Sequence, residues 1–428
     1  MTGSPGSPDV LGSDDNQLRW EARLPFHYGW VIVAVGAVVS MAVLGMGRFA
    51  FGMVLPSMRD GLGFSYGDAG WIGTCNFLGY LAGASRAGAV AKRLGPRTTV
   101  TVGLALVALS LALVTFASAL WAVIVLFTLT GLGSGIANVT MVAMTGMWFL
   151  KSMRGWASGL VVGGIGLGLM GSGLIVPAVN RVIGPGDGWR LSWRIMAGSI
   201  AVVGVIAAVL LRDGPQYVGI KAAGHPVRDA VEPAPVSEAE QRRTTLTLGL
   251  VYSMYGFAYA IFVTFIVTTL VEQRGLAESA AGWIWFVIGL LSLACGFFGK
   301  LSDRVGRKRG LAIVFAMHAV AYLIVGLQLP GMLLYAAVAL FGIAAWSVPG
   351  IMGAVVGDYL PPAQAVHALG ALTIFFGIGQ AAGPALAGVI GQHTGEFTSA
   401  YLLAALAALI GAVGSLLMRQ PGGDTPRA

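Results

Sequence analysis

Long runs of apolar residues alternate with short polar segments along this chain, and twelve of the runs are long enough to cross a lipid bilayer. A hydrocarbon core of about 30 Å requires about 20 residues of α-helix. The pattern therefore predicts twelve transmembrane helices, with ends that can shift by about 2 to 4 residues. The predicted spans are 28–56, 69–91, 98–117, 120–147, 156–179, 191–211, 245–271, 280–300, 310–328, 331–356, 367–390 and 399–418.

Two longer polar segments divide the chain into parts. Met1–Arg23 is rich in Gly, Ser, Pro and Asp and contains too little apolar surface to order itself. It has no basic n-region, so it is not expected to be a signal peptide. Arg212–Arg243 contains four prolines and mixed charge, which favours a linker between two halves. The predicted parts are a disordered cytoplasmic N-terminus (1–27), a six-helix bundle (28–211), a cytoplasmic linker (212–243), a second six-helix bundle (244–418) and a cytoplasmic tail (419–428).

The composition excludes a soluble domain. Hydrophobic residues make up 56% of the 428 residues and charged residues only 10%, whereas soluble domains carry about 25% charged residues. The 64 glycines suit membrane helices, in which small residues let backbones approach closely. Two cysteines in apolar runs provide neither a disulfide framework nor metal-ligand spacing. We therefore expect no metal and no cofactor.

The basic residues predict the orientation in the membrane. Of the 26 Lys and Arg residues, 19 fall on the side of the N-terminus, five on the other side, and Arg48 and Arg86 fall within predicted spans. Because basic loops stay in the cytoplasm, both termini should be cytoplasmic in a multi-pass protein of the cell inner membrane. Topology explains the net charge of +8 without nucleic-acid binding.

Two basic loops indicate an internal repeat. Gly299–Lys308 follows the eighth predicted span, and Gly88–Arg97 follows the second span, at the equivalent place in the first half. The later loop, GKLSDRVGRK, resembles the G-x-L-x-D-R-x-G-R-K signature of the major facilitator superfamily. The resemblance implies an all-α integral membrane fold of two pseudo-symmetric six-helix bundles that rock about a central cavity. It also implies a gating role for the signature residues, of which we single out Asp303, Arg304, Gly306 and Arg307.

The earlier loop departs from the signature, because Lys92 stands where the aspartate is expected. Within the superfamily, Tyr28–Val33 with Gly52 and Pro56 resembles the bacterial monocarboxylate and oxalate-type branch. A second set of residues resembles a neighbouring, poorly characterised bacterial group instead. This set is Gly47–Ala50, Ala69–Trp71 and Asn76–Tyr80.

Arg48 is the strongest candidate for a binding residue. In a helix from Trp30 to Met58 it lies about 27 Å from one end and about 15 Å from the other. A charge at that depth needs a cavity or a partner, and all eighteen acidic residues lie in termini, loops or span ends. An arginine without a carboxylate suits an anionic substrate, which its planar group can bind bidentately. The alternative is an Arg48 that snorkels to the surface or bonds backbone carbonyls.

Several uncharged residues are further, weaker candidates for the same site. By the resemblance, spans one, four, seven and ten line the cavity, and spans two, five, eight and eleven form its walls. Each residue has the alternative of an ordinary interhelical hydrogen bond. His318, in peripheral span nine, is expected to be structural. The further candidates for substrate binding are Asn138, Tyr255, Tyr259 and Trp346, with Asn76 and Gln380 on the walls.

The motifs indicate transport rather than catalysis. A Walker loop, a zinc spacing and a nucleophile elbow are absent from the sequence, so we expect a gradient-driven transporter and not an enzyme. The predicted substrate is a small organic anion, with a monocarboxylate and proton symport as the specific form, although no buried acid offers itself as the proton carrier. The predicted protein is a monomer in the lipid bilayer. The alternatives are export of a hydrophobic or cationic compound, which Trp283, Trp285 and Trp346 would suit, and a membrane receptor or scaffold.

Overall fold

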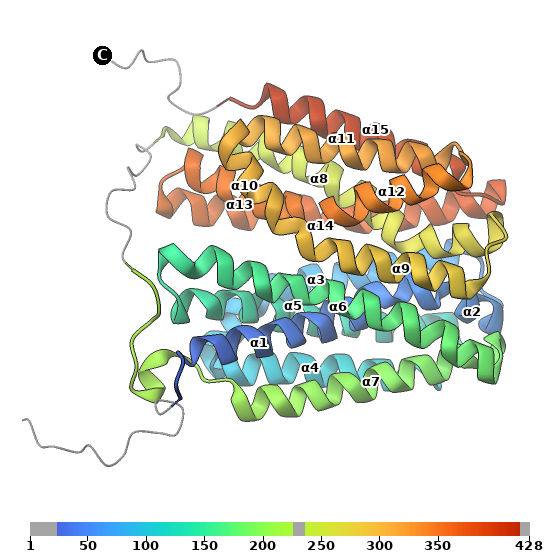
Figure 1. Ribbon diagram of the computed structural model, residues 1–428, viewed down its shortest axis with the longest axis horizontal. Coiled ribbons are helices and arrows are strands. Elements are labelled where there is room, and N and C mark those ends of the chain that lie inside the picture. The colour runs from blue at the N-terminus through green and yellow to red at the C-terminus, as the bar shows by residue number, and fades with distance from the viewer. Residues whose placement is uncertain (1–23, 226–235, 420–428) are drawn as a thin grey trace, which may run out of the picture.

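The computed structural model describes residues 24–225 and 236–419. These residues form six long helical segments in each half, and the two halves lie side by side (Figure 1). Apart from an isolated β-bridge between Phe149 and Ala223, these residues form no β-structure. The first half contains α1 (Gly29–Ser40), η2 (Met41–Phe49), α2 (Ala50–Leu62), α3 (Tyr66–Leu94), α4 (Pro96–Val114), α5 (Leu120–Trp148), α6 (Lys151–Ile183) and α7 (Pro185–Leu210). The second half contains α8 (Glu238–Thr268), η4 (Thr269–Gln273), α9 (Glu278–Ser292), η5 (Leu293–Cys295), α10 (Gly296–Val305), α11 (Arg307–Gly326), α12 (Gly331–Ala344), α13 (Ser347–Tyr359), α14 (Pro362–Thr394) and α15 (Thr398–Leu417).

The predicted all-α membrane fold is confirmed. Among the described residues, eleven helical segments are long and apolar enough to cross a membrane. The twelfth segment, α3, has 29 residues and coincides with the predicted span 69–91, but its glycines and polar residues lower its hydropathy. Several helices extend beyond the apolar runs, because a helix does not need to stop where the hydrocarbon ends.

Some predicted parts lie wholly or partly outside the described residues. The described range begins at residue 24 and ends at residue 419, so it includes little of the predicted N-terminus and tail. Within the predicted linker, a short 3-10 helix, η3, spans Pro215–Val218. The helix α8 begins at Glu238, also inside the predicted linker, because the Ser237 hydroxyl accepts a hydrogen bond from the Glu240 backbone N–H at 3.3 Å and caps the helix.

The two halves repeat one another in the lengths of their helices and in the turns between them. The third helical segments of the two halves, α4 and α11, have 19 and 20 residues, and the fifth segments, α6 and α14, have 33 residues each. Glycines with positive φ recur at equivalent places. Gly95 and Gly306 precede α4 and α11, and Gly184 and Gly395 follow α6 and α14. The repeat seen in the two basic loops therefore extends over both halves.

Glycines allow the helices within each half to pack with their backbones in contact. A Cβ added at Gly131 of α5 would collide with the Asn76 carbonyl of α3, and one at Gly79 of α3 would collide with the Thr128 carbonyl. Gly164 of α6 likewise lies against the Ala37 backbone of α1. This close packing accounts for much of the glycine content, since lipid supplies no hydrophobic force between helices.

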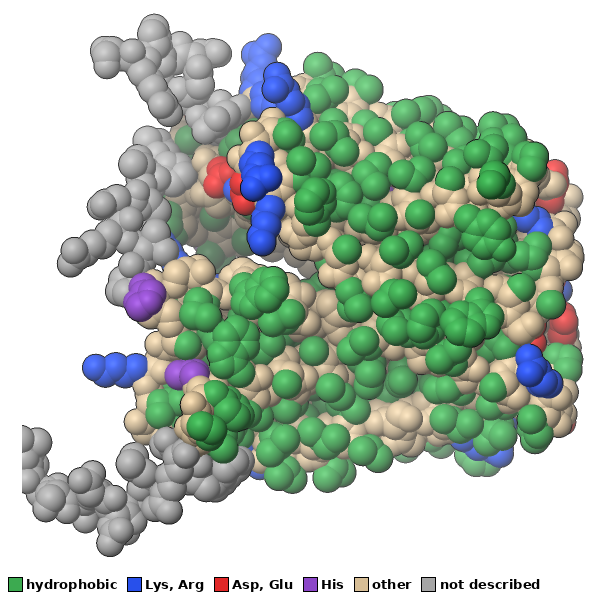
Figure 2. All heavy atoms as spheres, in the orientation of Figure 1, with side chains coloured by type: hydrophobic (Ala, Val, Ile, Leu, Met, Phe, Trp, Pro, Cys, Tyr) green, Lys and Arg blue, Asp and Glu red, His purple; other side chains and the backbone are tan. Residues whose placement is uncertain are grey.

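The two halves meet chiefly through three helix pairs, α3 with α14, α6 with α9 and α2 with α8. We call the end at which α1 begins and α7 ends the linker end, and the opposite end the far end (Figure 1). Towards the far end the halves touch closely, because a Cβ at Gly70 would meet the Pro384 carbonyl and one at Gly173 the Gly282 carbonyl. Towards the linker end, Gly159 and Gly299 have no neighbour within 4 Å of such a Cβ. Figure 2 shows the surface hollowed between the halves at the linker end.

Replacing Gly131 by alanine should destabilise the protein, whereas the same change at Gly159 should not. The new methyl group at Gly131 meets the Asn76 backbone, and overpacking of this kind costs about 1 to 3 kcal/mol. Gly159 has open space, and there alanine gains about 1 kcal/mol of helix propensity. Thermal unfolding of the two purified variants in detergent measures both effects. A Gly131→Ala protein as stable as the Gly159→Ala protein would contradict the role of Gly131 in helix packing.

Candidate functional site

Arg48 lies in the middle of the first helical segment, where the helix widens into the π-helical stretch η2. Its side chain is buried, with 5% of its surface exposed. π-Helical turns are rare and frequently mark functional sites, because they redirect a side chain out of the regular helical pattern. None of the ion pairs formed within residues 24–225 and 236–419 includes Arg48. The positive charge is therefore held in the protein interior without a carboxylate.

Aromatic rings surround the Arg48 guanidinium. Its central carbon lies 4.1 Å from the centroid of the Tyr80 ring, 4.3 Å from that of Phe77 and 5.5 Å from that of Phe49. A guanidinium over an aromatic ring gains about 2 kcal/mol or more when water is excluded. Phe49 in turn stacks on Trp346 of the second half, with centroids 4.9 Å apart. The rings offset part of the cost of burying the charge without neutralising it.

One direct hydrogen bond joins Arg48 to the second half. Arg48 Nη2 donates to Gln380 Oε1 of α14 at 3.3 Å, and Gln380 Nε2 donates to the Tyr259 hydroxyl of α8. Arg48 Nε has no hydrogen-bond partner among the described residues, although it is buried. The site thus contains one cation, one neutral amide and the phenols of Tyr80 and Tyr259, with an N–H of the guanidinium still free to bind an acceptor.

The other candidate residues divide into two groups. Trp346 lies at the site through its contact with Phe49, and Asn138 reaches it indirectly by donating to the Tyr80 hydroxyl at 3.1 Å. Asn138 Oδ1 and Trp346 Nε1 have no partner within the described residues. Asn76 lines the cavity beside Arg48, but its side chain donates to the Phe127 carbonyl at 2.9 Å and ties α3 to α5. The Tyr255 hydroxyl donates to the Ala345 carbonyl, next to the break between α12 and α13. These last two polar side chains hold helices together.

Three aromatic residues around Arg48, namely Phe49, Phe77 and Tyr80, were not singled out as binding residues by the sequence, whereas Tyr259 and Trp346 were. Phe49 and Phe77 carry no polar side-chain atom, and Tyr80 was noted only as the end of the segment Asn76–Tyr80. Two signals were present in the sequence. All three residues lie in Gly47–Ala50 or Asn76–Tyr80, which resemble the poorly characterised bacterial group, and Phe49 follows Arg48 while the other two lie one helical turn apart. The glycines beside Arg48 also serve packing, because Gly45 contacts Gly168 and Gly52 contacts the Val263 carbonyl.

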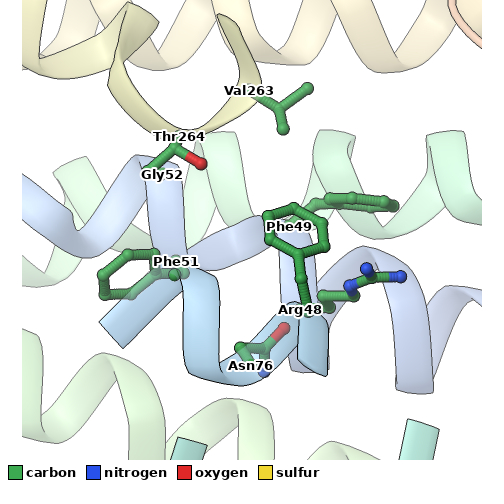
Figure 3. Close-up of a pocket in the computed structure, with 9 residues that line it drawn as sticks. Arg48, Phe49, Phe51, Gly52, Asn76, Val263 and Thr264 are labelled. Carbon is green, nitrogen blue, oxygen red and sulfur yellow. The ribbon is translucent and has the colours of Figure 1, made fainter. Parts of the chain in front are cut away.

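The space beside Arg48 is small in this conformation. A cavity of about 10 Å³ is lined by residues of η2, α2, α3 and α8, and this volume is close to the minimum that holds one water molecule. Figure 3 shows Phe49 and Gly52 facing Val263 and Thr264 of α8 across the narrow gap. An organic ligand therefore requires the two halves to move apart here, or side chains to rearrange.

A polar cluster joins the two halves at the far end. Glu272 of η4 accepts hydrogen bonds from Arg59 Nη2 at 2.8 Å and from the Tyr66 hydroxyl at 2.5 Å. The side chains of Glu272 and Arg59 are 16% and 21% exposed, and Glu272 Oε1 is buried without a hydrogen-bond partner in the described structure. We call Arg59, Tyr66 and Glu272 the far-end cluster. A separate hydrogen bond also joins the halves, in which Asn180 of α6 donates to Glu278 of α9 at 2.5 Å.

At the linker end, the residues of the superfamily signature interact within the second half. Arg307 pairs with Asp303 and, through Nε at 2.6 Å, with Asp358 of α13. Gly306 adopts φ +91°, a conformation that side chains other than glycine rarely take. No hydrogen bond of Arg304 is found in the described residues. The signature therefore joins α10, α11 and α13, and the hollow at this end separates it from the first half (Figure 2).

Comparisons with known proteins agree with this architecture. The family model MFS_4, described as "Uncharacterised MFS-type transporter YbfB", matches residues 40–416. The Hexuronate transporter of Bacillus subtilis (strain 168) is 26% identical over 83% of this chain and 87% of its own. Monocarboxylate transporter 11 of Homo sapiens is 26% identical over 88% of this chain and 80% of its own.

A solved structure shares the fold. It is a bacterial homolog of the human lysosomal transporter Spinster, in an inward-facing and unoccupied conformation. The TM-score is 0.68 at 15% sequence identity, and the match covers 91% of this chain and 95% of the other. At this identity the likeness concerns the fold alone.

Replacing Glu272 by glutamine should loosen the far end. The change keeps the shape of the side chain but removes the charge that attracts Arg59, a loss of about 1 kcal/mol or a five-fold shift in opening. The reporter is Thr74→Cys, on the contact between α3 and α14, in a protein with Cys75 and Cys295 replaced by alanine. Glu272→Gln should increase its rate of maleimide labelling.

Glu396→Gln is the matched control for this experiment. Glu396 also lies at the far end, but among the described residues its carboxylate accepts hydrogen bonds from Gln328 and Thr398, both in its own half. Labelling in this control should match that of the reporter protein alone. Equal labelling rates in the Glu272→Gln and Glu396→Gln proteins would rule out a role for the far-end cluster in closure.

Proposed function

The chain belongs to the MFS_4 family of MFS-type transporters, and from this premise we propose that it carries a small organic anion across the membrane. The proposed mechanism is alternating access, in which the two six-helix halves rock about the interface that contains Arg48. The substrate site consists of Arg48 and the aromatic residues around it, with Gln380 and Tyr259 on the opposite half.

The unpaired charge of Arg48 is the observation that carries this proposal. A buried charge without a partner is costly, and in membrane segments such residues mark the paths of substrates or ions. Arg48 has no carboxylate partner in the described residues and has an unused N–H at Nε. A substrate carboxylate supplies both the missing charge and the missing acceptor, so this site favours an anion over a neutral or cationic compound.

The names of the relatives support the same substrate class. One is a hexuronate transporter and another is a monocarboxylate transporter, and the substrates in both names carry a carboxylate. We propose a monocarboxylate for this chain, because the polar groups around Arg48 are neutral. A second carboxylate would have no cation to compensate it at this site.

The conformation supports alternating access with the linker end open. We propose that the N- and C-termini and the linker face the cytoplasm, because the basic residues gather in the loops of that end. The structure then represents a state closed towards the outside. Outward opening must separate the far-end cluster, in which Arg59 and Tyr66 belong to one half and Glu272 to the other.

Proton dependence is proposed from the same cluster. The titratable and charged groups that face Glu272 are Arg59, Asp60 and Tyr66. Protonation of Glu272 removes the charge that attracts Arg59, so a proton taken up from outside favours the outward-open state. Glu272 thus provides an acid between the halves at the far end, which the sequence alone did not identify.

Export of hydrophobic compounds has less support from the structure. Of the three tryptophans that suited this alternative, Trp283 is 59% exposed on the outer surface of α9. Trp285 is buried between the halves, where its Nε1 donates to the Ser172 hydroxyl at 3.1 Å. Only Trp346 lies at the site, through its stack on Phe49.

Substitutions of Arg48 test the proposed function. Arg48→Lys keeps the charge but loses the planar, bidentate group, whereas Arg48→Gln loses the charge. For a carboxylate ligand, lysine should retain weak binding and glutamine almost none, with a loss of about 2 to 5 kcal/mol. The measurement is uptake of labelled lactate and related acids into proteoliposomes, with and without a pH gradient. Normal uptake by a well-folded Arg48→Gln protein would exclude the anion site.

Asp303→Asn should slow transport without weakening substrate binding. Asp303 is an exposed partner of Arg307 at the linker end, distant from Arg48 along the helices, and we propose that it contributes to closing this end. Transport should fall several-fold while the dissociation constant of the substrate stays unchanged. Asp187→Asn, at the exposed start of α7, is the control and should transport normally. Lost binding with unchanged turnover in Asp303→Asn would contradict a gating role.

A further inference from the structure

The hydrogen bond between Arg48 and Gln380 crosses from one half of the molecule to the other. Arg48 belongs to η2 in the first half and Gln380 to α14 in the second, 332 residues later. Gln380 is buried, with 1% of its surface exposed. Its amide nitrogen is held by the Tyr259 hydroxyl, so its amide oxygen is directed towards Arg48. Within the described residues, the acceptor that reaches the guanidinium is therefore a neutral amide oxygen.

We propose that the Gln380 amide oxygen occupies the position that a carboxylate oxygen of the substrate takes at Arg48. Gln380 is then a positioning residue that keeps the charged site intact while it is empty and gives way when a monoanion enters. This inference rests on the proposed function, because it presumes that Arg48 binds an organic anion.

The arrangement of the guanidinium supports this role. Nε and Nη2 lie on the same edge of the group and together bind a carboxylate bidentately. In this structure Nη2 donates to Gln380 Oε1 at a long 3.3 Å, and Nε donates to no described residue. Of the two N–H groups that can bind a carboxylate, the one at Nε is therefore unused and the one at Nη2 makes a weak hydrogen bond. A carboxylate satisfies both N–H groups with charged acceptors, which bind about twice as strongly as neutral ones.

Displacement of Gln380 would couple binding to movement of the halves. The Arg48–Gln380 bond joins the two halves, and a substrate that binds Arg48 in place of Gln380 breaks this direct link. The aromatic contact of Phe49 with Trp346 and Tyr259 remains as the neighbouring connection. Substrate entry thus replaces a rigid bond between protein groups with a bond to a mobile ligand, which favours separation of the halves.

A resident carboxylate provides the test. Gln380→Glu keeps the shape of the side chain and places a negative charge next to Arg48, so it should act as a built-in substitute for the substrate. The affinity for lactate and benzoate should fall by about 100-fold, as for loss of a buried charge partner, and the melting temperature without ligand should rise. Gln380→Met, which removes the competing oxygen without adding charge, should bind the same acids at least as tightly as the wild type.

The control is Gln216→Glu, which adds the same charge at an exposed position of η3, outside both bundles, and should leave binding unchanged. Binding is measured by calorimetry on monodisperse protein in detergent, with lactate, benzoate, oxalate and glucuronate as probes. Wild-type affinity in Gln380→Glu would overturn the inference, as would a loss of affinity in Gln380→Met equal to that in Gln380→Glu.

These outcomes are separate from failure of the proposed function. If the wild-type protein binds none of the four acids, the proposed anion site is wrong and so is the inference that rests on it. If the wild type binds and Arg48→Gln does not, the proposed function stands whatever the Gln380 variants show. A preference for oxalate over the monoanions would contradict the single-charge site.

Discussion

Keeping one guanidinium charged inside a membrane protein without a carboxylate is the constraint around which this molecule is arranged. The environment of Arg48 meets it with aromatic ring faces, one neutral amide and burial at a helix interface. A resident aspartate or glutamate would satisfy the charge better, but it would also compete with any anion that enters. In the proposed function, an anion binds because Arg48 keeps an unneutralised charge and an unused N–H group. A fully satisfied arginine has nothing to gain from a substrate.

The contacts between the halves differ in kind at the two ends. Towards the far end, glycine backbones touch and the far-end cluster adds charged hydrogen bonds across the interface. Towards the linker end, Gly159 and Gly299 face open space, and the charged residues of the signature bind within their own half. Alternating access requires interfaces at the two ends to be comparable in free energy, so that a ligand with a few kcal/mol of differential affinity can shift the balance. Packing by glycine is suited to this, because it gives close contact with little side-chain interlocking.

The fold was largely predictable from the sequence, and the site only in part. Apolar runs of the necessary length predict helices because the bilayer leaves no other way to satisfy the backbone, and the repeat of the two halves follows from one duplicated loop. Arg48 stands out because its charge is anomalous in an apolar run. Gln380 was a candidate on the cavity wall, but its pairing with Arg48 could not be deduced, since no local signal joins residues 332 apart. Asn76 and Tyr255 look equally suitable in sequence but bind backbone carbonyls, because the direction of a polar side chain depends on helix rotation. The π-helical stretch that redirects Arg48 is equally invisible to a pattern based on the regular α-helical period.

The two halves share helix lengths but have diverged in how they secure the linker end. In the second half, Asp303 and Asp358 both bind Arg307. In the first half, Lys92 replaces the equivalent of Asp303, and Asp213 supplies the carboxylate by accepting from the Arg97 backbone N–H at 2.7 Å. Arg97 in turn donates to the Ala208 carbonyl at the end of α7. The first half is thus fastened to the segment that leads into the linker, and the second half is fastened internally. The two surfaces at the linker end therefore differ in charge. The second half presents the carboxylates of Asp303 and Asp358, and the first half presents a basic loop that contains Lys92. We propose that closure of this end brings these opposite charges together.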